Sequence, residues 1–268
     1  MDPKELKLIV KEKYGEIADQ SREQNQSSCC GSTCGCNSTD TTIFTADYSQ
    51  LEGYMEEADL GLGCGIPTEF AGINKGDHIL DLGSGAGNDC FVARWMTGET
   101  GSVTGLDFTQ KMVDKARENL SKTNYTNIDF VPGDIEEMPL PNDKFDVVLS
   151  NCVLNLVPDK EKAFSEIFRV LKKGGHFCIS DVVLLGELPD KLRNEAEMYA
   201  GCVSGALQKE DYLAVIQKAG FTNIEVKREI QTSIPDEILL TYLEKEELEK
   251  YKAKEQGIFS ITVVGIKE

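Results

Sequence analysis

The chain has 268 residues and a formal net charge of −18 at pH 7. Binding to nucleic acids and to anionic membrane surfaces depends on Lys and Arg, so this charge argues against both kinds of partner. No segment approaches the ~20 apolar residues of a membrane helix, and the N-terminus has no signal-peptide core. We therefore expect a cytoplasmic protein whose nine cysteines are held reduced.

The first 60 residues predict a helix followed by a flexible, cysteine-rich segment. Apolar residues recur at helical spacing over 4–18, and a short helix is expected within 47–60. Between them, SSCCGSTCGCN (27–37) holds four cysteines that suit a zinc clip, a disulfide staple, a redox relay or a soft-metalloid site. The spacing is not the paired C-x2-C of structural zinc, and a reducing compartment argues against a permanent staple. The remaining roles for segment 27–37 are a redox tether and a segment that captures a metalloid.

Residues 61–268 predict a single α/β domain. Between 78 and 182, five apolar runs alternate with helical patterns, which is typical of a doubly wound, Rossmann-like parallel sheet. Residues 188–219 look like a helical insertion on the substrate side. Residues 220–268 contain two late strands with a short helix between them, and we expect the final strand to be antiparallel.

The segment DLGSGAGND (81–89) lies between the first strand and its helix. Gly83 and Gly85 allow a tight turn close to a ligand, and the helix N-terminus offers unpaired N–H groups. Nicotinamide cofactors favour G-x-G-x-x-G, whereas the spacing here is G-x-G-x-G. Asp81 stands directly before the loop, where a pyrophosphate would be repelled and an ammonium group would be favoured.

Two more acids follow the next strands. Asp107 is placed to accept hydrogen bonds from ribose hydroxyls, and Asp134, beside Ile135, is placed to hold an adenine amino group. Any one of these acids could instead cap a helix or a turn. Three acids at the ends of three consecutive strands share the edge where open α/β sheets bind ligands.

Together, DLGSGAGND, GLD, GDIEEMP, FDVVLSN and RVLKKGGHF resemble the class I S-adenosylmethionine-dependent methyltransferases, over residues 65–268. The resemblance implies a seven-stranded sheet with an antiparallel final strand. It also implies that Asp81 and Gly83 hold the methionine end of the cofactor, Asp107 the ribose and Asp134 the adenine. The rest of the implied cofactor site is Ser84, Gly85, Phe108, Ile135 and Asn151.

Three further motifs are similar to the arsenite methyltransferases: GCGIP (63–67), SNCVLNLVPDK (150–160) and AGCVSGAL (200–207). The resemblance implies that Cys64, Cys152 and Cys202 together bind trivalent arsenic, as free arsenite or as its thiol conjugate, for methylation and detoxification. Soft thiolates suit this soft element, and its lone pair needs no general base. One of Cys29 or Cys30 matches the N-terminal cysteine of the family's redox relay, which thioredoxin or glutathione reduces.

Two rival functions remain. One is a methyltransferase for a small organic acceptor such as a quinone precursor, which has no use for three cysteines at the cofactor edge. The other is a non-catalytic metalloid-binding protein on a methyltransferase scaffold, which the intact cofactor acids disfavour. For Cys90 and Cys178 we expect only core packing, the usual fate of a free cysteine.

Overall fold

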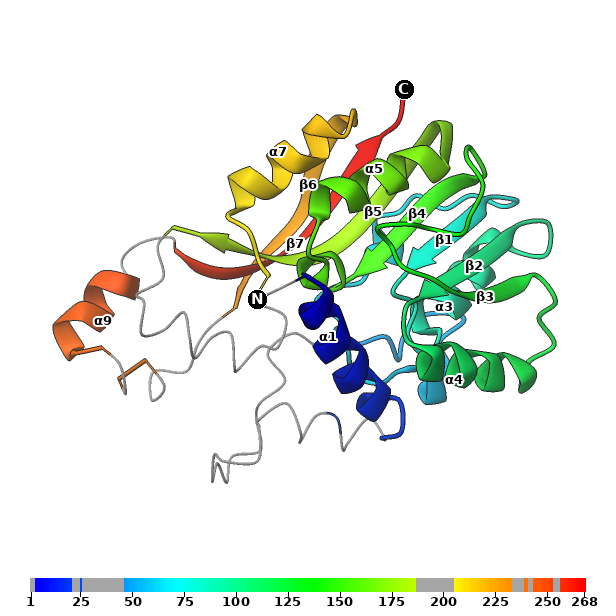
Figure 1. Ribbon diagram of the computed structural model, residues 1–268, viewed down its shortest axis with the longest axis horizontal. Coiled ribbons are helices and arrows are strands. Elements are labelled where there is room, and N and C mark those ends of the chain that lie inside the picture. The colour runs from blue at the N-terminus through cyan, green and yellow to red at the C-terminus, as the bar shows by residue number, and fades with distance from the viewer. Residues whose placement is uncertain are drawn as a thin grey trace.

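The computed structural model describes residues 3–20, 25, 46–186, 205–232, 239–240, 243–252 and 256–268. Its sheet has the strand order β3-β2-β1-β4-β5-β7-β6 (Figure 1). The strands are β1 (His78–Leu82), β2 (Ser102–Asp107), β3 (Ile128–Pro132), β4 (Phe145–Asn151), β5 (Leu171–Leu185), β6 (Thr222–Thr232) and β7 (Gly257–Ile266). Neighbours among β1 to β5 pair in parallel, whereas β7 runs antiparallel to β5 and β6. The predicted seven-stranded α/β fold and its antiparallel final strand are confirmed.

Helices cover both faces of the sheet. The helices are α1 (Pro3–Ile17), α3 (Asn88–Thr97), α4 (Gln110–Ser121), α5 (Lys160–Val170), α7 (Lys209–Lys218) and α9 (Lys245–Lys252), of which α3, α4, α5 and α7 pack on the strands. Because successive strand residues point to opposite faces, Ile79 shares a core cluster with Phe91 of α3, and Leu80 shares another with Phe164 of α5. Burial on both faces explains the continuous apolar runs that predicted these strands.

The helix expected within 47–60 is wrong. This segment forms turns and only a short 3-10 helix, η1 (Glu56–Ala58). Gly53 adopts a φ of 86°, and a Cβ there would lie 2.7 Å from Cβ of Trp95, so the chain turns tightly against α3. The cysteine-rich stretch 27–37 and most of the predicted insertion 188–219 lie outside the described residues; from 205 onward the helical prediction is met by α7.

The fold brings the carboxyl ends of β1, β2 and β4 to one edge, where the strand order reverses about β1. Open α/β sheets bind ligands at such a point. Figure 1 shows α1 beyond the arrowheads of β1 and β4, and this helix also contacts α4. In the part of the chain that the structure describes, no helix is both long and apolar enough to cross a membrane.

Candidate active site

A pocket opens at the carboxyl ends of β1, β2 and β4. The predicted cofactor residues all line it: Asp81, Gly83, Ser84, Gly85, Asp107, Phe108, Asp134, Ile135 and Asn151. Cys152 lines it as well, and so does Gly63, the neighbour of Cys64. The fold thus gathers residues from five separate segments of the sequence into one cavity.

The glycine loop forms the floor of this pocket. Gly83 adopts a φ of 66°, and a Cβ there would lie 2.4 Å from Cγ2 of Val153, so only glycine fits. The Gly85 N–H donates to Oδ2 of Asp107 at 2.9 Å, which ties the loop to β2. The buried Oγ of Ser84 has no hydrogen-bond partner among the described residues. An unpaired buried hydroxyl on a pocket wall is suited to a polar group of a ligand.

Three carboxylates line the pocket: Asp81 and Asp89, which are buried, and Asp107, which is partly buried. Burial, followed by the charges of Asp89 and Asp107, raises the pKa of Asp81 well above its usual range. Burial raises the pKa of Asp89 to about 6 and also raises that of Asp107, against the hydrogen bonds that its backbone neighbours donate. A cationic ligand would stabilise the ionised forms. S-Adenosylmethionine, with an ammonium and a sulfonium group, fits this set of acids.

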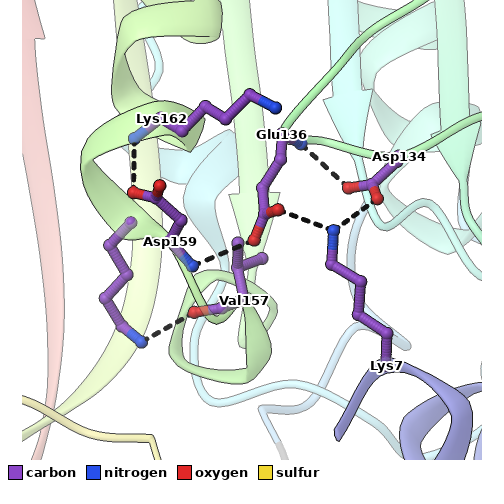
Figure 2. A network of polar contacts seen from close by, with 7 residues as sticks. Lys7, Asp134, Glu136, Val157, Asp159 and Lys162 are labelled. Atoms are coloured by element: carbon purple, nitrogen blue, oxygen red, sulfur yellow. Dashed lines mark hydrogen bonds and ion pairs between the residues drawn. The ribbon is translucent and has the colours of Figure 1, made fainter. Parts of the chain in front are cut away.

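The N-terminal helix adds a wall that the sequence did not reveal. The Lys7 Nζ lies 2.5 Å from Oδ2 of Asp134 and 2.6 Å from Oε2 of Glu136 (Figure 2). Oε1 of Glu136 accepts the N–H of Asp159, the residue that caps α5. Partial burial opposes the charge of Lys7, yet its hydrogen bonds to the two acids leave its pKa raised. The amphipathic pattern predicted α1 itself, but no sequence signal connects Lys7 with acids more than a hundred residues away.

Cys152 lines the pocket, and Cys64 follows Gly63, which lines it as well. Cys152 follows β4 with a φ of 60°, a conformation uncommon outside glycine, and its N–H donates to the carbonyl of Ser180 at 2.8 Å. The Cys64 N–H donates to Oδ1 of Asn151 at 3.0 Å, and its carbonyl accepts from the Ser260 hydroxyl. Each cysteine is only 6% exposed. Asn151, the residue directly before Cys152, therefore bonds the Cys64 turn to the end of β4.

The two glycines beside Cys64 have a packing reason. A Cβ at position 63 would lie 2.9 Å from Nδ2 of Asn151, and one at position 65 would lie 2.6 Å from Oγ of Ser180. The turn can approach β4 and β5 this closely only without side chains at those positions. The remaining predicted thiols, Cys202, Cys29 and Cys30, lie outside the described residues.

Cys90 and Cys178 pack in the core as predicted. Both are fully buried, and they belong to the cluster between the sheet and the helices α3 and α4. The Cys178 thiol donates to the carbonyl of Pro67 at 3.1 Å, and the Cys90 thiol donates to Oδ2 of Asp81 at 3.2 Å. Burial, with the charge of Asp81 next, raises the pKa of Cys90 well above its usual range, so this thiol stays protonated beneath the pocket.

Comparison with known proteins agrees with this geometry. Residues 73–220 match the methyltransferase domain family. An arsenite methyltransferase of Halobacterium salinarum is 39% identical over 237 residues, which cover 84% of this chain and 59% of that protein. One from Homo sapiens is 35% identical over 229 residues, covering 81% of this chain and 58% of that protein. The chain thus matches less than two thirds of the length of these relatives.

Among solved structures, the sheet and its helices resemble an arsenic(III) S-adenosylmethionine methyltransferase from Chlamydomonas reinhardtii. The TM-score is 0.63 and the sequence identity 35%, and the match covers 76% of this chain and 67% of that one.

Proposed function

The chain belongs to the methyltransferase domain family, and from this membership we propose that it transfers methyl groups from S-adenosylmethionine to thiol-bound trivalent arsenic, as a detoxification enzyme. One observation carries the proposal: the acid-lined pocket has a cysteine, Cys152, in its wall and a second, Cys64, held by the neighbouring Asn151. The arsenite methyltransferases that match at 39% and 35% identity support the choice of substrate.

We assign the ammonium group at the methionine end of the cofactor to Asp81. The Ser84 hydroxyl could donate to the carboxylate at the same end of the cofactor. Asp107 would hold the ribose. Its Oδ1 accepts the Thr109 N–H and its Oδ2 accepts the Gly85 N–H, which fix the carboxylate at the end of β2, in the wall of the pocket. Asp134, beside Ile135, would hold the adenine amino group.

Arsenic would be held by Cys64, Cys152 and Cys202. Three thiolates can enclose As(III) in a pyramid that leaves its lone pair pointing outward. The cofactor would supply an electrophilic methyl group on a positively charged sulfur, which the arsenic lone pair accepts without loss of a proton. The protein's contribution is then alignment of the thiol-bound arsenic with that methyl group. The Cys64 turn, held by a bond to Asn151, the chain neighbour of Cys152, serves this purpose.

A thiol reductant completes the proposed cycle. Methyl transfer takes arsenic from the trivalent to the pentavalent state. Its return to the trivalent state requires two electrons, which two thiols supply as they form a disulfide. We assign the entry of these electrons to Cys29 or Cys30, with thioredoxin or glutathione as the reductant. Replacing both cysteines with serine should stop thioredoxin-supported multiple turnover and leave the first turnover intact.

The direct test is to incubate the reduced protein with arsenite, methyl-labelled S-adenosylmethionine and thiol, and to separate the products. We expect labelled methylarsenicals. Label in a quinone precursor, with none in arsenic, would favour the organic-acceptor methyltransferase. Tight arsenite binding with no labelled product would favour a metalloid-binding protein.

A further inference from the structure

A buried hydrogen-bond network lies between the cofactor pocket and the Cys64 turn. The Tyr48 hydroxyl is 2.9 Å from Oδ1 of Asp89, and it accepts from Nδ2 of Asn151 at 2.8 Å. The same Nδ2 donates to the carbonyl of Gly65 at 2.9 Å, and Oδ1 of Asn151 accepts the Cys64 N–H at 3.0 Å. Tyr48 is 3% exposed and Asp89 is 7% exposed, so water competes little for these bonds.

We propose that Tyr48 and Asp89 are positioning residues that hold the Asn151 amide, and through it the Cys64 turn, against the cofactor pocket. The inference rests on the proposed function, in which Cys64 is an arsenic ligand. Neither Tyr48 nor Asp89 belongs to the cofactor or thiol residues named from the sequence.

The network specifies one orientation of the Asn151 side chain. Its amide nitrogen has two hydrogens, which match the Tyr48 oxygen and the Gly65 carbonyl, and its oxygen matches the N–H of Cys64. A flipped amide would point its nitrogen at the Cys64 N–H and its oxygen at the Gly65 carbonyl and the Asp89 carboxylate. Tyr48 and Asp89 therefore select the orientation that binds the Cys64 backbone.

Close packing around Asn151 and Tyr48 limits how far the Cys64 turn can move. The space beside Gly63 is closed by the Asn151 side chain, which a Cβ at 63 would meet at 2.9 Å. On the other side, Tyr48 packs in a cluster with Ile66 and Val92. The turn therefore cannot shift without movement of Asn151, and Asn151 cannot move without breaking its bond to Tyr48.

Asp89 also connects the network to the cofactor, because it lines the pocket. A cationic ligand favours the ionised carboxylate, which is the stronger acceptor for the Tyr48 hydroxyl. Arsenite should therefore bind more tightly beside the cationic cofactor than beside its uncharged-sulfur product. By linkage, the cofactor gains affinity from arsenite by the same factor.

The test is Tyr48→Phe, which removes the hydroxyl and keeps the ring in its cluster. Arsenite affinity is measured on the reduced protein by arsenic–thiolate absorbance, and cofactor affinity by calorimetry. We expect arsenite affinity, and kcat/KM for arsenite, to fall about tenfold, since the buried hydrogen bonds of the Tyr48 hydroxyl to Asp89 and Asn151 are lost. At pH 8, well above the pKa of Asp89, the cofactor Kd should stay within about twofold, because Tyr48 does not line the pocket. The matched control is Tyr125→Phe, whose ring lies under Arg94 away from the pocket and which should change neither affinity.

A second readout needs no arsenic. The rate at which iodoacetamide alkylates Cys64, mapped by mass spectrometry, should rise about tenfold in Tyr48→Phe while that of Cys178 stays unchanged. A wild-type protein that makes no methylarsenical breaks the proposed function but leaves this readout intact. Unchanged Cys64 alkylation and unchanged arsenite affinity in a folded variant would overturn the positioning role. If Tyr48→Phe does not fold, Asp89→Asn, which keeps the side-chain shape, replaces it. The same two measurements, Cys64 alkylation and arsenite affinity, then decide the positioning role.

Discussion

The two walls of the pocket are built differently. On the cofactor wall, Asp107 ends β2, and Gly85, 22 positions earlier, lies in the loop that follows the neighbouring parallel strand β1. On the thiol wall, the Cys64 turn is held by Asn151 and Ser260, which lie 87 and 196 positions away. The strand topology brings the acids at the strand ends to one edge, whereas side-chain bonds to remote residues hold the Cys64 turn. Substitutions should therefore separate cofactor binding from arsenic handling.

The sharpest separation is expected from Cys152→Ser. Serine keeps the size of the side chain but offers a hard oxygen, a poor ligand for soft As(III). We expect arsenite methylation to fall by at least about 100-fold, a loss of ~2.7 kcal/mol of transition-state stabilisation, with the cofactor Kd within about twofold. The measurements are product formation and calorimetry. Cys178→Ser, the same change at a buried thiol bonded to Pro67, is the control and should remain active. Full methylation by Cys152→Ser would contradict the role of Cys152 as an arsenic ligand.

On the opposite wall, Asp107→Ala should weaken cofactor binding by about 30-fold, because charge-assisted hydrogen bonds contribute more than neutral ones. Arsenite affinity measured without cofactor should be unchanged. Asp129→Ala, at an exposed position of β3, provides the control. Equal cofactor Kd values for the wild type and Asp107→Ala would remove this residue from the ribose role.

A smaller effect should appear in the pH dependence of the cofactor wall. Because the pKa of Asp89 is raised to about 6, a cationic cofactor must displace a proton below this pH. Cofactor affinity should rise several-fold between about pH 5 and 7. Calorimetry in two buffers of different ionisation enthalpy should detect proton release near pH 6 and little at pH 8. By the same linkage, the ligand-free protein loses stability as the pH rises from about 4 to 6. A cofactor Kd that is constant over this range would contradict the assignment.

The smallest expected effect concerns α1. Lys7→Met removes the ion pairs with Asp134 and Glu136, whose side chains are partly buried, so cofactor release should accelerate by about threefold. Stopped-flow displacement measures this rate. Lys111→Met breaks an exposed pair with Asp19 at the other end of α1 and should leave the rate unchanged. Equal release rates in both variants would mean that α1 does not retain the cofactor.

Much of the fold could be predicted because it depends on local patterns. The five parallel strands are apolar runs buried on two faces, and the glycine loop and strand-end acids keep fixed offsets from them. The segment 47–60 was misread as a helix because its apolar spacing satisfies a helical period, while Gly53 turns the chain against Trp95. That contact is made with a residue more than forty positions away.

The sequence alone predicts the doubly wound sheet and the acid-lined edge from residue type and spacing, whereas the candidate thiols are what its resemblance to the arsenite methyltransferases implies. Only the tertiary structure decides that Lys7 reaches Asp134 and that Tyr48 and Asp89 meet Asn151. The physical reason is that a buried hydrogen bond depends on distances of about 3 Å between atoms. Such distances between remote segments exist only once the whole core has packed.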